Sequence, residues 1–141
     1  MKFKTEEVQD RFMLMHPRAQ ELAREMDEWT MKHFGKELTI TATTSTVAED
    51  KALGRVSDTH RTGRAFDIRT SDLTDTIIAN LCTYFRRLYN QKLGASSDKQ
   101  CNLIVYKPHG TGPHLHVQLN RKYTRLVGDV DVKKQKQETK A

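Results

Sequence analysis

The chain has 141 residues, 36% of them hydrophobic and 30% charged, a balance typical of one soluble domain with a single core. No stretch approaches the ~20 apolar residues of a membrane span, and the first residues lack the apolar middle of a signal peptide, so we expect synthesis and folding in a cytoplasm. The net charge of +6 favours an anionic partner, either nucleic acid or the anionic wall of a bacterium.

Apolar residues at helical spacing predict two helices at the start of the chain. The first covers residues 5–15 and ends before Pro17, because the residue preceding a proline is pushed away from α geometry. Pro17 suits the first turn of the second helix, which follows a 3.6-residue repeat to Phe34. Gly35 is the expected C-terminal stop of that helix.

Two strands with different surroundings are predicted next. Residues 38–42 alternate apolar side chains with threonines, which is typical of a half-buried strand. Residues 46–58 have no consistent period and are predicted to form a loop. Gly63 permits a tight turn or a close backbone approach before the strand 64–69. In that strand Asp67 shares one face with Ala65 and Arg69, and apolar side chains occupy the other.

The rest of the chain continues with a helix and two strands. A helix is predicted over residues 72–93, with Ser71 or Asp72 as its N-cap. Residues 103–105 are predicted to be a buried strand. Residues 114–119 alternate most regularly, with both histidines and a glutamine on one face and apolar residues on the other.

These elements predict an α+β domain whose small, mostly antiparallel sheet has helices on one face and a zinc site on the other. Residues 1–130 are expected to form this single domain, and the Lys- and Gln-rich end, 131–141, to be a disordered basic tail. Cys82 and Cys101 are too few for a disulfide scaffold, and Cys82 fits the buried stripe of its helix.

His60, Asp67 and His116 carry the chemistry that suggests a metal. A hydrolytic zinc site needs three ligands from imidazole and carboxylate groups, with a fourth position left open for water. Singly, His60 could be a loop histidine and Asp67 a salt-bridged strand carboxylate. Together with His116 in this pattern, they favour one bound zinc ion per chain.

The order Ser57, His60, Gly63, Ala65, Asp67, followed later by His-x-His, resembles the LAS zinc peptidases. This superfamily contains lysostaphin, the D-Ala-D-Ala metallopeptidases and the sonic hedgehog domain. The resemblance covers roughly residues 17–120. It is greatest to the D,D-carboxypeptidases and small phage peptidoglycan endopeptidases.

The resemblance implies roles for the residues of the motif. It makes His60, Asp67 and His116 the zinc ligands and His114 the catalytic histidine. Two branches of the family carry an acidic residue three positions before the last histidine, where this chain has Pro113.

Substrate contacts follow less directly from the resemblance. Relatives often carry an arginine just after the first strand that contacts the substrate carboxylate. This chain has none there, and Arg55 is the nearest substitute in sequence. Ser57 and Arg64 lie within the motif and could brace the site or contact the substrate.

The expected function is zinc-dependent hydrolysis of a peptide bond in bacterial peptidoglycan, in a stem peptide or a cross-bridge. A phage lysis enzyme or a D,D-carboxypeptidase-like peptidase, acting as a monomer at the cell wall or in the periplasm, would fit. The alternative is a catalytically inactive zinc-containing binding module of the same fold. A nucleic-acid binder is disfavoured, because the basic faces lack the interleaved aromatic residues of single-strand platforms.

Overall fold

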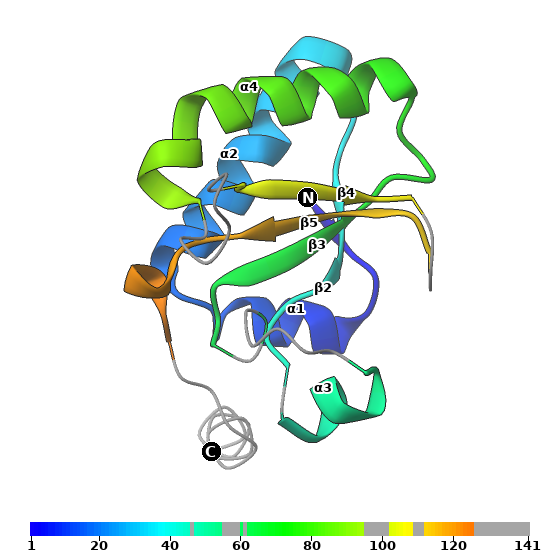
Figure 1. The fold of residues 1–141 in the computed structure, drawn as a ribbon. Coiled ribbons are helices and arrows are strands. Elements are labelled where there is room, and N and C mark those ends of the chain that lie inside the picture. The colour runs from blue at the N-terminus through cyan, green and yellow to red at the C-terminus, as the bar shows by residue number, and fades with distance from the viewer. Residues whose placement is uncertain (46, 55–59, 61, 95–101, 109–111, 126–141) are drawn as a thin grey trace.

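The computed structural model describes residues 1–45, 47–54, 60, 62–94, 102–108 and 112–125 (Figure 1). The elements in chain order are β1 (Lys2–Phe3), α1 (Glu6–Phe12), α2 (Pro17–Phe34), β2 (Thr39–Ala42), α3 (Val47–Ala52), β3 (Ala65–Arg69), α4 (Asp75–Leu93), β4 (Ile104–Lys107), β5 (His114–Gln118) and the 3-10 helix η1 (Arg121–Tyr123). None of the helices in these ranges combines the length and the apolar character that crossing a membrane requires.

The five strands form one sheet in the order β1-β2-β3-β5-β4. β1 and β2 run parallel, and the other neighbouring pairs run antiparallel. The predicted α+β class and the mostly antiparallel sheet are therefore confirmed. The central pair, β3 and β5, is in register along its whole length, which fixes which side chains share a face.

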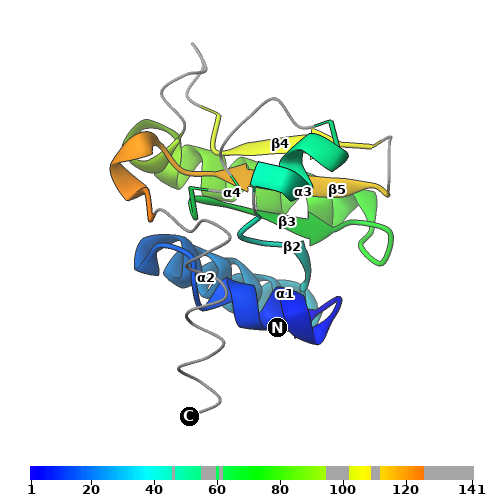
Figure 2. The same cartoon turned by 90° about the horizontal axis from the view of Figure 1, so that it is seen from below.

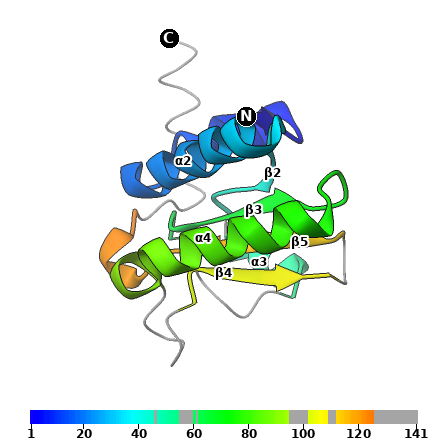
Figure 3. The ribbon, with the colours of Figure 1, turned by 90° about the horizontal axis from the view of Figure 1, so that it is seen from above.

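The helices α2 and α4 cover one face of this sheet. Figure 3 shows both running along the same side of the strands, and Figure 2 shows α4 behind the strands and α3 in front of them. The strands turn Phe66, Ile68, Leu115 and Val117 towards the helical layer, and all four are buried in the common core. Burying each of these side chains stabilises the fold by about 1.5–3 kcal/mol. Because side chains alternate between the two faces of a strand, this burial also holds the intervening side chains on the opposite face.

The predicted boundaries of α2 are confirmed by its end contacts. His16 is the N-cap, and its Nδ1 accepts a hydrogen bond from the backbone N–H of Arg18 at 3.0 Å. Pro17 occupies the first helical position. Gly35 ends the helix in the left-handed region (φ 64°), and its N–H donates to the carbonyl of Met31.

The predicted N-cap of α4 is wrong. The cap is Thr74, whose side-chain oxygen accepts from the N–H of Ile77 at 3.2 Å. Leu73 is buried, and its N–H donates to the carbonyl of Thr70 in a turn. The helix therefore begins only after this turn, and Ser71 and Asp72 lie outside it.

Two further elements differ from the prediction. Residues Val47–Ala52, placed in a loop by sequence, form α3, a helix too short to show a period. β1 was not predicted, because its two residues carry no pattern; backbone bonds from Lys2 and Lys4 to the carbonyls of Leu38 and Ile40 define it. The tail expected over residues 131–141 lies outside the described residues.

Candidate metal centre

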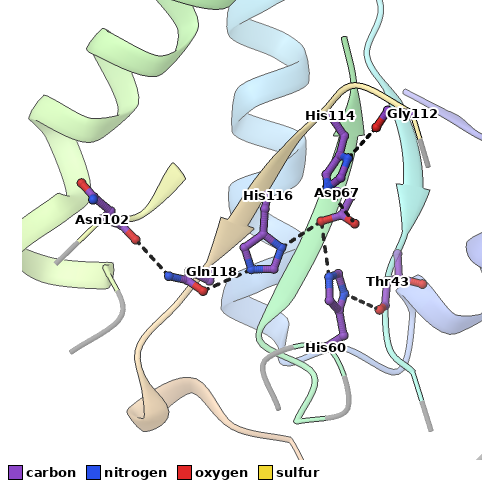
Figure 4. A network of polar contacts seen from close by, with 8 residues as sticks. All are labelled: Thr43, His60, Asp67, Asn102, Gly112, His114, His116 and Gln118. Carbon is purple, nitrogen blue, oxygen red and sulfur yellow. Dashed lines mark hydrogen bonds and ion pairs between the residues drawn. The ribbon is translucent and has the colours of Figure 1, made fainter. Parts of the chain in front are cut away.

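Asp67 and His116 are cross-strand neighbours at the centre of the sheet, on the face away from α2 and α4. His60 enters from the segment before β3, so three side chains from three places in the chain converge there (Figure 4). Their exposed fractions are only 4%, 7% and 7% for His60, Asp67 and His116. Buried polar groups of this kind require partners, because an unpaired one is costly.

The turn at Gly63 positions His60. Gly63 has φ 68°, and its N–H donates to the His60 carbonyl at 3.0 Å. Its own carbonyl accepts from the N–H of His16 at 2.8 Å, and a Cβ at this position would lie 2.7 Å from the carbonyl oxygen of Arg125. Both the tight turn and the close backbone approach allowed by glycine are therefore used here.

The three ligand groups form a compact set around Asp67. Its Oδ1 lies 2.9 Å from His116 Nδ1 and 3.3 Å from His60 Nε2. One potential ligand atom from each residue lies within 4.8 Å of the others. Ligand atoms around a tetrahedral zinc are ~3.3 Å apart, from metal–ligand distances of about 2.0–2.2 Å. The group could therefore hold a metal ion.

Oxygen acceptors on the far side of each imidazole direct one nitrogen of each ring towards the cluster. The carbonyl of Thr43 lies 2.8 Å from His60 Nδ1, so this nitrogen is the donor and Nε2 presents its lone pair. Gln118 Oε1 lies 3.1 Å from His116 Nε2, and its amide nitrogen donates to the Asn102 carbonyl at 3.5 Å. His116 Nδ1 is then the lone-pair nitrogen. Such outer contacts set the tautomer of metal-bound histidines.

The lone pairs create an electrostatic conflict that a cation removes. With the far nitrogens protonated, His60 Nε2 and His116 Nδ1 both face the carboxylate of Asp67 across 3.3 and 2.9 Å. Two lone pairs cannot approach an anionic oxygen this closely without a proton or a cation between them. A divalent metal ion satisfies all three groups at once.

The pKa shifts favour the ionisation states that a metal needs. Without a metal ion, a proton on the near nitrogen of each imidazole takes the place of the cation. Burial opposes ionisation of Asp67, but the charge of His60 and the hydrogen bonds that both imidazoles then donate hold its pKa well below the usual range. Burial lowers the pKa of His116 by more than the hydrogen bond to Asp67 raises it. A carboxylate beside a neutral imidazole is the ligand form required for metal binding.

His114 lies next to this cluster and outside it. Its Nε2 is 3.8 Å from Asp67 Oδ2, and its side chain is 20% exposed, against 9% for His116. Its Nδ1 donates to the Gly112 carbonyl at 2.8 Å, so Nε2 is the nitrogen able to accept a proton. The ring thus combines a fixed tautomer with access to solvent.

Arg64 acts as a brace beneath the site. It is 2% exposed, its Nη1 donates to the Leu119 carbonyl at 2.6 Å, and its Nε donates to the Thr62 hydroxyl at 3.0 Å. The bond to Leu119 joins the residue before β3 to the residue after β5. Burial makes Arg64 unsuited to contact a substrate; Ser57 and Arg55 lie outside the described residues.

The support given by Thr43 and Gln118 was not predicted. α1 holds the segment containing Thr43, whose hydroxyl donates to the carbonyl of Val8 at 3.2 Å. A carbonyl contact leaves no trace in residue type, so nothing in the sequence could identify Thr43. Gln118 did carry a signal, because strand alternation places it on the face of both histidines.

Comparison of the chain with protein-family models, with curated proteins and with solved structures finds no match.

Proposed function

We propose that His60, Asp67 and His116 bind zinc. The support is the donor set: two imidazole nitrogens and one carboxylate oxygen, each oriented by an outer hydrogen bond or by its strand, with spacings near those of a tetrahedral site. When bound there, zinc supplies Lewis-acid chemistry that activates water near neutral pH and polarises a carbonyl.

We further propose that the centre hydrolyses a peptide bond, and the observation that carries this is the position of His114. Its Nε2 stands beside the ligands, and the Gly112 carbonyl holds the ring in the tautomer that accepts a proton. Nε2 would take a proton from the attacking water and return it to the leaving nitrogen. The water oxygen joins the carbonyl carbon, the C–N bond breaks, and an acid and an amine are released. General acid–base help of this kind is worth about 10²–10⁴ in rate.

Peptidoglycan stem or cross-bridge peptides are the substrate class that we propose. Support comes from the resemblance of the motif to the LAS peptidases and from the net charge of +6, which favours anionic wall material. A phage lysis enzyme or a D,D-carboxypeptidase-like peptidase is the biological setting that fits this substrate.

Digestion of purified bacterial walls tests this function. Mass spectrometry of the soluble products should identify a new terminus after treatment with the wild type. His114→Ala should retain its metal, and its rate of hydrolysis should fall by a factor of about 10²–10⁴. His33→Ala, at the exposed end of α2, is the control and should retain full activity.

The inactive binding module is kept as a second candidate because of Pro113. This residue occupies the position of an acidic group in two branches of the resembled family, and its side chain cannot accept a proton. Wall binding by a zinc-loaded wild type that releases no new terminus would favour the binding module and contradict hydrolysis.

A further inference from the structure

His60 is the ligand of the candidate centre whose position depends on a turn. Asp67 and His116 lie on paired strands, so the ladder between β3 and β5 fixes both of them. His60 precedes β3, and its carbonyl accepts from the N–H of Gly63 in the turn that enters this strand. The place of the His60 imidazole therefore depends on what holds this turn against the rest of the chain.

The segment that follows β5 returns to this turn. It consists of residues 120–125, which we call the clasp. At its beginning, the N–H of Asn120 donates to the carbonyl of Leu93 at 2.8 Å. At its end, the N–H of Arg125 donates to the carbonyl of Thr62, also at 2.8 Å. The clasp therefore connects the last residue of α4 with the turn before β3.

Hydrogen bonds within the clasp give it a defined shape. Asn120 is the N-cap of η1, and its side-chain oxygen accepts from the N–H of Lys122 at 3.0 Å. The N–H of Tyr123 donates to the Asn120 carbonyl at 3.0 Å. The hydroxyl of Thr124 donates to the Arg121 carbonyl at 2.7 Å. The clasp is thus a folded element in its own right, and little further ordering is needed for it to hold the turn.

The junction between α1 and α2 encloses the turn from its other side. The N–H of His16 donates to the Gly63 carbonyl at 2.8 Å. Arg125 Nη1 donates to the carbonyls of Met13 and Met15 at 3.3 and 3.4 Å, so the clasp is tied to the same junction. The carbonyl oxygen of Arg125 would lie 2.7 Å from a Cβ on Gly63. Backbone therefore packs against the turn from two sides, and Arg125 takes part in both contacts.

We propose that Arg125 is a positioning residue for the metal centre, and that docking of the clasp and binding of zinc stabilise each other; this rests on the zinc site proposed above. The clasp restricts the backbone at Thr62, and the Thr43 carbonyl, 2.8 Å from Nδ1, sets the tautomer of the His60 ring. Arg125 acts through the turn alone. A clasp that favours the metal-competent position of His60 is itself held more firmly once the metal is bound, because such coupling is reciprocal.

The zinc dissociation constant of the 141-residue chain, measured against a chromophoric chelator, is the first test. Arg125→Met removes the guanidinium, while Gln20 Nε2 still donates to both carbonyls that lose it. Zinc should bind about 2–10-fold more weakly, the net worth of about one hydrogen bond. Arg125→Pro removes the N–H that donates to Thr62 and should weaken binding by about 10–100-fold. Thr124 already has the extended backbone (φ −85°, ψ 133°) that a following proline requires.

Charge and stability are controlled separately. Arg87→Met removes one positive charge at an exposed position of α4 and should bind zinc as the wild type does. Loss of a positive charge by itself favours a cation, so weaker zinc binding in Arg125→Met has the opposite sign to a charge effect. A purely structural role would lower the free energy of unfolding in urea and leave the dissociation constant unchanged, because nearly all of the chain stays folded without urea.

Hydrogen exchange in the wild type tests the reciprocal effect without any substitution. Saturating zinc should slow exchange of the Arg125 amide about 2–10-fold more than exchange of the Asn120 amide, which bonds to Leu93 at the other end of the clasp. An equal effect of zinc on the two amides overturns the proposal. Zinc affinity that is unchanged in both Arg125 variants overturns it as well, and if Arg125→Pro fails to fold, Arg125→Met and the exchange measurement decide.

The outcomes also separate this inference from the proposed function. Equal zinc affinity in the wild type and the Arg125 variants leaves the zinc site standing and removes the clasp from it. A wild type that binds no zinc contradicts the proposed function, and the metal-free chain then decides the role of Arg125. Nitrogen NMR resonances of the His60 ring should shift in Arg125→Met, whereas those of His116, held by its strand, should not. Unchanged His60 resonances overturn the positioning role.

Discussion

Gln118 offers the sharpest test of how the centre is organised, because it contacts His116 on the side away from the other ligands. Its Oε1 accepts from His116 Nε2 at 3.1 Å, which keeps the proton off Nδ1. Gln118→Met removes this acceptor with little change in side-chain length. The proton can then move to Nδ1 and bond to Asp67 Oδ1, 2.9 Å away, where it competes directly with a metal ion.

The expected cost follows from this competition. Loss of such an outer partner weakens metal binding by about 10–100-fold, equivalent to roughly 1.4–2.7 kcal/mol. Competition against a chromophoric chelator would measure the zinc dissociation constant, and circular dichroism would check that the fold is retained. Gln91→Met, at an exposed position of α4, is the matched control and should bind zinc as the wild type does.

A charged residue in place of Gln118 is the complementary variant in this experiment. Gln118→Glu retains an oxygen acceptor for His116 Nε2, so its zinc affinity should remain close to that of the wild type or exceed it. Unchanged affinity in Gln118→Met would refute the reasoning about the tautomer. Equal weakening in both variants would show that Gln118 acts through packing instead.

Three other perturbations follow from the structure. Gly63→Ala should lower the free energy of unfolding by about 1–3 kcal/mol in urea denaturation, because its Cβ meets the Arg125 carbonyl. Gly35→Ala is the control: it has the same left-handed backbone but open space around it, and it should lower the free energy of unfolding by less. Equal losses in the two variants would contradict the argument. Burial lowers the pKa of His116, and burial together with the charge of Arg125 lowers the pKa of His16. The unfolded chain therefore takes up protons at a higher pH than the folded chain, and the metal-free protein should lose stability as pH falls below about 6.5. Stability that rises between pH 7.5 and pH 5.5 in the presence of a chelator would contradict this. Saturating zinc at about 100 times its dissociation constant should raise the free energy of unfolding by about 2.7 kcal/mol, and an unchanged denaturation midpoint would argue against a native metal site.

The parts of the fold that the sequence predicted are those with a regular period or a strong end signal. α2 was predictable because Pro17 and Gly35 mark its ends and its apolar stripe is continuous. β5 was predictable because its apolar and polar residues alternate strictly. The short elements β1 and α3 were missed, since two or six residues cannot display a period.

The grouping of His60, Asp67 and His116 was predicted from residue chemistry together with the resemblance of the motif to the LAS peptidases, and their proximity is what the structure adds. Strand alternation predicts on which face of its own strand each of Asp67 and His116 lies. Only the pairing of β3 with β5 makes the two residues neighbours. The same pairing sets Arg69 opposite His114, a relationship between residues far apart in sequence. Register is a tertiary property, decided by core packing and hydrogen bonding between strands.

Elemental analysis of the purified 141-residue chain tests the central claim most directly. The wild type and His114→Ala should each contain one zinc per chain, because His114 lies outside the ligand group. His60→Ala and Asp67→Ala should each lose the metal while circular dichroism shows a folded protein. Full zinc retention in both ligand variants, or loss of zinc from His114→Ala, would contradict the assigned centre.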